Sequence, residues 1–118
     1  MSGKYGGPAD RLAVYEALVA GNDDVERRGA TVPYTSRNGH MFSFLDASGT
    51  MALRLSADDR ATFMEQYQTT IAEQYGRQMK EFVVVPDDLL ERTDELGTWL
   101  GRSHEWIGTL KPKPTKRT

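Results

Sequence analysis

The sequence predicts an α+β fold, a single two-layer domain in which helices pack on an antiparallel five-stranded sheet. Two observations carry this prediction. Short segments rich in strand-forming residues are joined by tight-turn signals such as Asn38-Gly39. Segments with apolar residues at helical spacing lie before, between and after them. The chain has 118 residues, enough for one domain with its own core. We expect this domain over residues 1–110, in the order helix, three strands, helix, two strands, helix, with a tail at 111–118.

Composition excludes several classes of function. The formal net charge is −2 and the chain has no cysteine. It therefore lacks an overall attraction to nucleic acid or anionic lipid, and it cannot form disulfides or thiolate metal sites. No apolar run approaches the ~20 residues of a membrane span, and the first residues lack the apolar core of a signal peptide. We expect a cytoplasmic protein with no membrane partner.

The first helix is expected over Ala9–Ala20. Pro8 suits the first turn of a helix. Gly21 and Asn22 end the helix, because both accept the left-handed conformation of a C-cap. The apolar residues that recur at helical spacing are Leu12, Tyr15, Leu18 and Val19.

A first strand is expected over Val25–Thr35. Thr31 and Val32 favour extended structure, whereas Gly29 and Pro33 indicate a bulge or an edge position. This strand would then turn through Asn38-Gly39, the strongest short hairpin signal in the chain.

The second and third strands are expected over His40–Leu45 and Met51–Leu55. The Asp46–Gly49 turn between them has Asp first and Gly last, as a type I turn with a G1 bulge requires. The resulting register pairs Leu45 with Met51, Ser43 with Leu53 and Met41 with Leu55. One face then carries Met41, Leu45, Met51, Leu53 and Leu55, and the other carries Phe42, Phe44, Ala52 and Arg54.

The second of these faces raises a question, because an outward face should not need two phenylalanines. Leaving both unburied would forgo roughly 1.5–3 kcal/mol for each ring. A helix covers that face as well, or the register is shifted by one residue, or a partner covers it. An exposed apolar patch of this kind is typical of an interface. The candidate interface residues are Phe42, Phe44 and Arg54.

A second helix is expected after Ser56, which is a good N-cap and has an acidic residue three positions later. Its buried stripe would be Phe63, Met64 and Tyr67. Thr69–Glu73 favours a short strand, and Tyr75-Gly76 turns the chain. Lys80–Val85 is the fifth strand. It ends in residues that are apolar on both sides, so we expect it inside the sheet.

Asp87–Arg92 is expected to form a helical turn, with Thr93 as the N-cap of a final helix. The final helix carries the clearest amphipathic stripe in the chain: Leu96, Trp99, Leu100, Ser103, Ile107 and Leu110. Its glycines each weaken it by about 1 kcal/mol relative to alanine, so packing must hold it. The remaining KPKPTKRT alternates proline with basic residues and is expected to be a basic disordered tail.

Several local patterns follow one another between Asp10 and Leu110. They are Gly39-His40-Met41-Phe42, Leu53-Arg54-Leu55, Tyr75-Gly76, Met79-Lys80-Glu81-Phe82-Val83, Val85-Pro86 before Leu89-Leu90, and the Leu96, Trp99 and Leu100 stripe. In this order they resemble the N-terminal domain of TfoX-type proteins, known from competence regulators and small bacterial proteins. The resemblance implies a secretion-chaperone-like arrangement of sheet and helices. It supplies no agreed catalytic residues, and a role in competence is not carried over.

Catalytic chemistry has little support in the sequence. His40 and His104 are the only histidines, with no HxH or HExxH spacing, and no phosphate-binding glycine pattern occurs. Pairs of acidic residues such as Asp58-Asp59 lie where helices begin, where they complement the helix dipole. We predict no catalytic, cofactor-binding or metal-binding residues and no cofactor.

Three functions remain open. The first is a non-enzymatic protein-interaction or regulatory module of the TfoX N-terminal type, acting as a homodimer or on a protein partner through its sheet. The second is a small-ligand-binding protein or enzyme with a pocket between sheet and helices, lined by Tyr15, Tyr67, Trp99 and Trp106. The third is weak nucleic-acid binding through the basic tail, against which the acidic balance of the chain and the lack of any recognition pattern argue.

Overall fold

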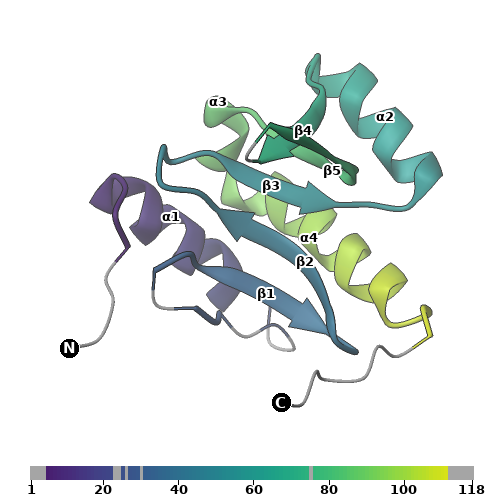
Figure 1. Cartoon of the computed structure of the whole chain (residues 1–118), viewed down its shortest axis with the longest axis horizontal. Coiled ribbons are helices and arrows are strands. Elements are labelled where there is room, and N and C mark those ends of the chain that lie inside the picture. The colour runs from purple at the N-terminus through teal and green to yellow at the C-terminus, as the bar shows by residue number, and fades with distance from the viewer. Residues whose placement is uncertain (1–4, 23–24, 26, 30, 75, 112–118) are drawn as a thin grey trace.

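The computed structural model of the chain has two layers, a five-stranded sheet and helices that cover one of its faces (Figure 1). It describes residues 5–22, 25, 27–29, 31–74 and 76–111. The predicted α+β class and the predicted order of elements are confirmed. The elements are α1 (Ala9–Ala20), β1 (Tyr34–Arg37), β2 (His40–Leu45), β3 (Met51–Arg54), α2 (Ala57–Tyr67), β4 (Ile71–Gln74), β5 (Arg77–Val85), α3 (Asp87–Leu90) and α4 (Thr93–Ile107).

The sheet has the strand order β1-β2-β3-β5-β4, with every neighbouring pair antiparallel. The interior position predicted for the last strand is confirmed, because β5 lies between β3 and β4. The first strand is corrected, since β1 begins at Tyr34 and not at Val25. Pro33 cannot donate to a ladder, and Gly29 has a φ of 84°. Before β1, the described residues contribute one isolated bridge, between Arg28 and Tyr34. Two positions of the predicted strand, 26 and 30, lie outside the described residues.

The turns of the central strands form as expected. Asn38 and Gly39 have φ angles of 55° and 79°, the pair of left-handed residues that a type I′ hairpin requires. Gly49 has a φ of 89°, and its N–H donates to the Asp46 carbonyl at 3.0 Å. The register that this second turn sets is confirmed at Leu45 opposite Met51 and Ser43 opposite Leu53.

A β-bulge in β2 changes which faces its side chains occupy. Thr35 pairs with Ser43, whereas the next residue of β1, Ser36, pairs with Met41. Phe42 is therefore an extra residue on β2, and the alternation of side chains breaks there. Phe42 lies in the core on the helix side of the sheet, and Met41 packs on the other side. The prediction that placed Met41 on the core face and Phe42 opposite it is wrong for this reason.

The main core lies between the sheet and all four helices. Its largest fully buried side chains are Tyr15, Phe42, Phe63, Leu18, Leu45, Met51, Leu53, Leu55, Leu89, Leu90, Leu96 and Leu100. Helix α4 crosses β2 and β3 and also packs against α1 (Figure 1). Its predicted stripe is confirmed at the four buried residues Leu96, Leu100, Ser103 and Ile107. Trp99 is partly buried, and Leu110 lies beyond the end of the helix.

Two predicted helix ends are corrected in detail. The side chain of Thr93 does not cap α4, because Thr93 is the first helical residue and Arg92 occupies the N-cap position without a side-chain bond. Gly21 ends α1 in a right-handed conformation, with a φ of −74°. Ser56 caps α2 as expected, because its hydroxyl accepts a bond from the Asp59 N–H at 3.4 Å.

The core contains a cluster of three hydroxyl groups. Ser43 Oγ lies 2.7 Å from the Tyr15 hydroxyl and 2.6 Å from Thr35 Oγ1, and all three residues are buried. Burial raises the pKa of Tyr15 to about 12, because the phenolate would lose its hydration there. The cluster ties α1 to the two strands beneath it.

No helix in the described part of the chain is long and apolar enough to span a membrane.

Candidate functional site

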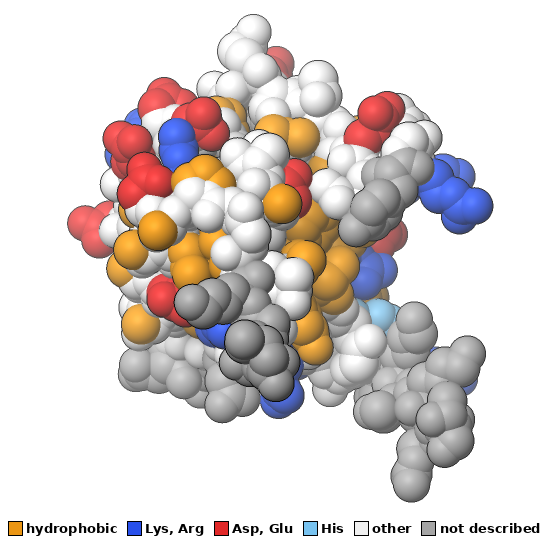
Figure 2. All heavy atoms as spheres, turned by 60° about the vertical axis from the view of Figure 1, so that its left-hand side comes forward, with side chains coloured by type: hydrophobic (Ala, Val, Ile, Leu, Met, Phe, Trp, Pro, Cys, Tyr) orange, Lys and Arg blue, Asp and Glu red, His pale blue; other side chains and the backbone are white. Residues whose placement is uncertain are grey.

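The face of the sheet opposite the helices carries a second apolar cluster. Its buried members are Phe44, Ala52, Ala72 and Phe82, and the partly buried residues packed on them are Tyr34, Met41, Met79 and Val84. All eight residues belong to strands, so no helix contributes to this cluster. The Phe44 and Phe82 rings are tilted by 48° with their centroids 5.6 Å apart. We call these eight residues the outer cluster. On the face of the molecule shown in Figure 2, hydrophobic side chains gather in a band.

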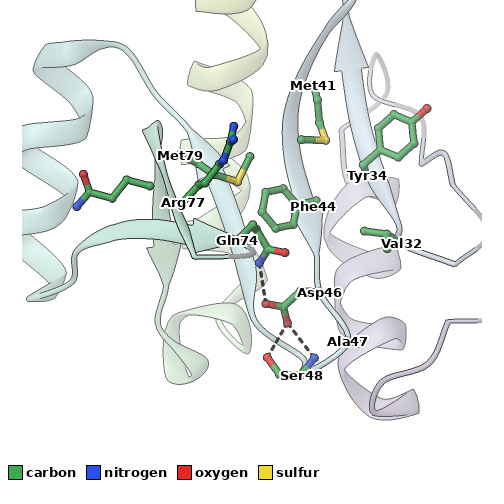
Figure 3. A pocket seen from close by; sticks show the side chains of 11 residues that line it. Val32, Tyr34, Met41, Phe44, Asp46, Ala47, Ser48, Gln74, Arg77 and Met79 are labelled. Atoms are coloured by element: carbon green, nitrogen blue, oxygen red, sulfur yellow. Dashed lines mark hydrogen bonds between the residues drawn. The ribbon is translucent and has the colours of Figure 1, made fainter.

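An irregularity in the pairing of β4 with β5 shapes this face. Ile71 pairs with Val83, and Glu73 pairs with Gln78. The stretch of β5 from Gln78 to Val83 therefore contains more residues than the stretch of β4 from Ile71 to Glu73 that it faces. Such extra residues bend a strand and increase its twist. Met79 lies between Gln78 and Val83, in the irregular stretch of β5, and in Figure 3 it stands beside Phe44.

A pocket of about 910 Å³ opens over the outer cluster. Met41 and Phe44 line it from β2, and Val32 and Tyr34 form the side next to β1 (Figure 3). The opposite side comes from the β4–β5 hairpin, and the Asp46–Gly49 turn closes one end. Val32 is 44 % exposed, the highest value among the large hydrophobic side chains that the structure describes.

The polar groups of the pocket differ at its two ends. At one end the Asp46 carboxylate is fully engaged: Oδ1 accepts bonds from the Ser48 N–H at 2.9 Å, the Ser48 hydroxyl at 2.6 Å and the Thr50 N–H at 3.0 Å. Its Oδ2 accepts a bond from Gln74 Nε2 at 3.3 Å, which joins β4 to the turn. At the other end Arg77 is exposed, and no described residue forms an ion pair or hydrogen bond with its guanidinium. The carboxylate at one end of the pocket is therefore held by neutral donors, and the guanidinium at the other end has no partner among the described residues.

The three candidate interface residues occupy different environments. Phe42 is fully buried in the main core, where its ring centroid lies 5.7 Å from that of His104. Phe44 belongs to the outer cluster and lines the pocket. Arg54 contacts α4, with its guanidinium carbon 5.6 Å from the centroid of the Trp106 ring, and its Nε donates to Glu81 at 2.7 Å. Of the three, Phe44 alone lines the pocket.

The four aromatic residues expected to line a pocket between sheet and helices are partly brought together. Tyr67 and Trp99 contact each other, because Trp99 Nε1 donates to the Tyr67 hydroxyl at 3.1 Å. That hydroxyl donates in turn to Glu95, and burial together with this carboxylate raises the pKa of Tyr67. Tyr15 lies elsewhere in the core and Trp106 lies beside Arg54. None of the four lines the pocket over the outer cluster.

Both histidine rings have a hydrogen-bond partner near the end of α4, a backbone carbonyl for His40 and the Arg37 side chain for His104. His40 Nε2 lies 2.9 Å from the Lys111 carbonyl oxygen, and His104 Nδ1 lies 3.3 Å from Arg37 Nη1. Arg37 also donates to the His104 carbonyl at 2.9 Å. Among the described residues, no group of three or more histidine, aspartate or glutamate side chains is placed to hold a metal ion. The basic tail from residue 112 onward lies outside the described part of the chain.

Most of the pocket residues carry no distinctive signal in the sequence. The predicted register puts Met41 on the core face, and Arg77 and Met79 precede the predicted start of the last strand. A turn signal followed by alternating apolar residues does not reveal a bulge, because the same composition fits either pairing. The apolar Phe82 was the available signal, since a strand apolar on both sides needs an apolar neighbour on each face.

Comparisons of the chain with protein-family models, with curated proteins and with solved structures found no match. The pocket is interpreted from its geometry.

Proposed function

We propose that the protein is a non-enzymatic protein-interaction or regulatory module that binds its partner through the outer cluster. The observation that carries this proposal is the pocket above Phe44, on the face of the sheet that none of the described helices covers. The resemblance to the N-terminal domain of TfoX-type proteins supports the same proposal and a bacterial source. The composition of the chain supports a cytoplasmic location.

Protein interfaces gain most of their affinity where an apolar anchor enters a well-packed pocket. The outer cluster supplies such a pocket, with a floor at Phe44, whose ring already packs against Phe82. Val32 is exposed at the rim of the pocket, where its apolar side chain can act as an anchor for another apolar pocket. A two-fold pairing of two copies would place the Val32 anchor of each on the cluster of the other. We therefore propose a homodimer through this face.

Sedimentation velocity across a range of concentrations tests the homodimer. The wild-type protein should associate, and Val32→Ser should weaken association by about tenfold, because the anchor loses its apolar contact. Val14→Ser in α1 is the matched control, since Val14 packs on the helix side of the sheet. It should leave association unchanged. A strictly monomeric wild type would overturn the homodimer, and equal weakening by both variants would place the interface elsewhere.

Binding of a small ligand is a second candidate function, favoured by the hollow shape of the site. Small-molecule pockets commonly have volumes of about 300–1,000 Å³ and apolar walls with a few polar groups. The pocket over Phe44 has about 910 Å³ and meets both criteria. The proposed ligand site therefore differs from the one that the sequence predicts: it lies on the open face of the sheet and not between the sheet and the helices. A thermal-shift screen that finds no stabilising compound would count against it.

A further inference from the structure

The pocket over the outer cluster combines an adaptable apolar interior with one unpaired cation. Met41 and Met79 lie on its two sides and Phe44 lies between them (Figure 3). Methionine side chains are flexible and polarisable, so they fit apolar groups of varied shape. Because Phe44 is only 4 % exposed, an occupant rests on a floor that is already packed.

The two charged side chains of the pocket, Asp46 and Arg77, determine which charge an apolar ligand should carry. A cationic ligand would compete at Asp46 with the Ser48, Thr50 and Gln74 donors, which already supply that carboxylate with four bonds. An anionic ligand finds the guanidinium of Arg77, which no described residue pairs. In Figure 3 this guanidinium lies near Met79, at the end of the pocket away from Asp46. A single guanidinium matches a single carboxylate, since its fork of N–H donors can bind both oxygens.

We propose that the pocket binds a free amphipathic carboxylate of the medium-chain type. The hydrocarbon chain lies over Phe44 between Met41 and Met79, and the carboxylate pairs with Arg77. This assignment rests on the small-ligand function proposed above and adds the chemical class of the ligand. It also gives the module a means of regulation, because the ligand and a protein partner would compete for the same face.

Decanoate and decanol, kept below the concentrations at which they aggregate, are suitable probes. Calorimetry should show that decanoate binds more tightly than the uncharged alcohol. Arg77→Gln should weaken decanoate by about tenfold, the usual cost of losing a charged hydrogen bond, and leave decanol unchanged. Arg102→Gln is the matched control. Arg102 pairs with Asp59 on α2 and takes no part in the pocket, so decanoate should bind this variant as it binds the wild type.

Methionine methyl signals locate the bound probe. Decanoate should shift the methyl signals of Met41 and Met79 and leave that of Met51, which is fully buried in the main core. Equal binding of decanoate and decanol, with no effect of Arg77→Gln, would overturn the carboxylate assignment and leave the small-ligand function standing. If neither probe moves Met41 or Met79, both proposals are wrong. A shift confined to Met51 would likewise overturn them, since it would place the probe in the core.

Discussion

Phe42 and Phe44 are two positions apart on one strand, yet they serve opposite faces of the sheet. Phe42 is fully buried under the helices, with its ring next to that of His104. Phe44 lies on the face opposite the described helices, where its ring packs against Phe82 at the base of a pocket. Regular alternation would put both rings on the same face. One bulge separates them, so the same residue type builds the fold on one side and a candidate site on the other.

The largest expected effect is the cost of removing each ring. Phe42→Ala should lower the free energy of unfolding by about 4 kcal/mol, because it leaves a cavity in a closed core. Phe44→Ala should cost about 2 kcal/mol, since water can enter the space left on the open face. Urea denaturation of both variants measures the difference. Equal costs would mean that the two faces are equally closed, and a larger cost for Phe44→Ala would reverse the comparison.

The hydroxyl cluster provides a test on the helix side alone. Ser43→Ala should cost about 2 kcal/mol, because it leaves the Tyr15 and Thr35 hydroxyls buried with one partner fewer. Tyr15→Phe should cost less in the Ser43→Ala background than in the wild type, because the two groups interact directly. The double-mutant cycle is measured by urea denaturation, and strictly additive costs would show that the cluster does not act as a unit.

The raised pKa of Tyr15 makes the helix side sensitive to alkaline pH. In the unfolded chain a tyrosine ionises near pH 10, whereas burial raises the pKa of Tyr15 to about 12. The folded state therefore holds the proton longer, and this contribution to stability is complete below pH 10 and lost as the pH rises from 10 to 12. The loss amounts to at most about 1.4 kcal/mol per pH unit.

Urea denaturation at intervals between pH 9 and pH 11 checks this sign on the wild type and on Tyr15→Phe. The variant should lose less stability over that interval, because its residue 15 does not titrate. Tyr34→Phe serves as the control, because Tyr34 packs on the outer cluster and takes no part in the hydroxyl cluster. Parallel curves for the wild type and Tyr15→Phe would contradict the burial of a protonated Tyr15.

The smallest expected effect belongs to the open face. Gln74→Ala removes the bond between Gln74 Nε2 and Asp46 Oδ2, which joins β4 to the turn at one end of the pocket. Since Asp46 keeps its three bonds within the turn, the free energy of unfolding should change by about 0.5 kcal/mol or less. Thermal denaturation measures this change. A loss of several kcal/mol would show that the pocket end is part of the folding core.

Local chemistry explains which parts of the fold could be predicted. Helix α1 and strand β2 have the bounds expected for them, because proline, glycine and turn signals stand at their ends. The register of β2 with β3 follows from the Asp46–Gly49 turn in the same way. The bulge at Phe42 depends on how β1 pairs with β2. The sequence of His40–Leu45 is compatible with a regular strand and with a bulged one, so it does not predict the bulge.

The pocket could not be predicted because it arises from pairing between distant residues. Arg77 and Met79 line the pocket from β5, at and next to the stretch where that strand pairs irregularly with β4. That irregularity is a property of the assembled sheet and has no turn signal of its own. The sequence displays two features of the site, the aromatic residue Phe44 with no evident cover and the apolar Phe82 in the last strand.

Methionine methyl NMR over a series of protein concentrations tests the division between the two faces most directly. Met41 and Met79 line the pocket on the open face, and Met51 is fully buried on the helix side. If the open face binds a second copy, the methyl signals of Met41 and Met79 shift as the concentration rises while that of Met51 stays in place. A shift confined to Met51, with Met41 and Met79 unmoved, would contradict the assignment of binding to the outer cluster.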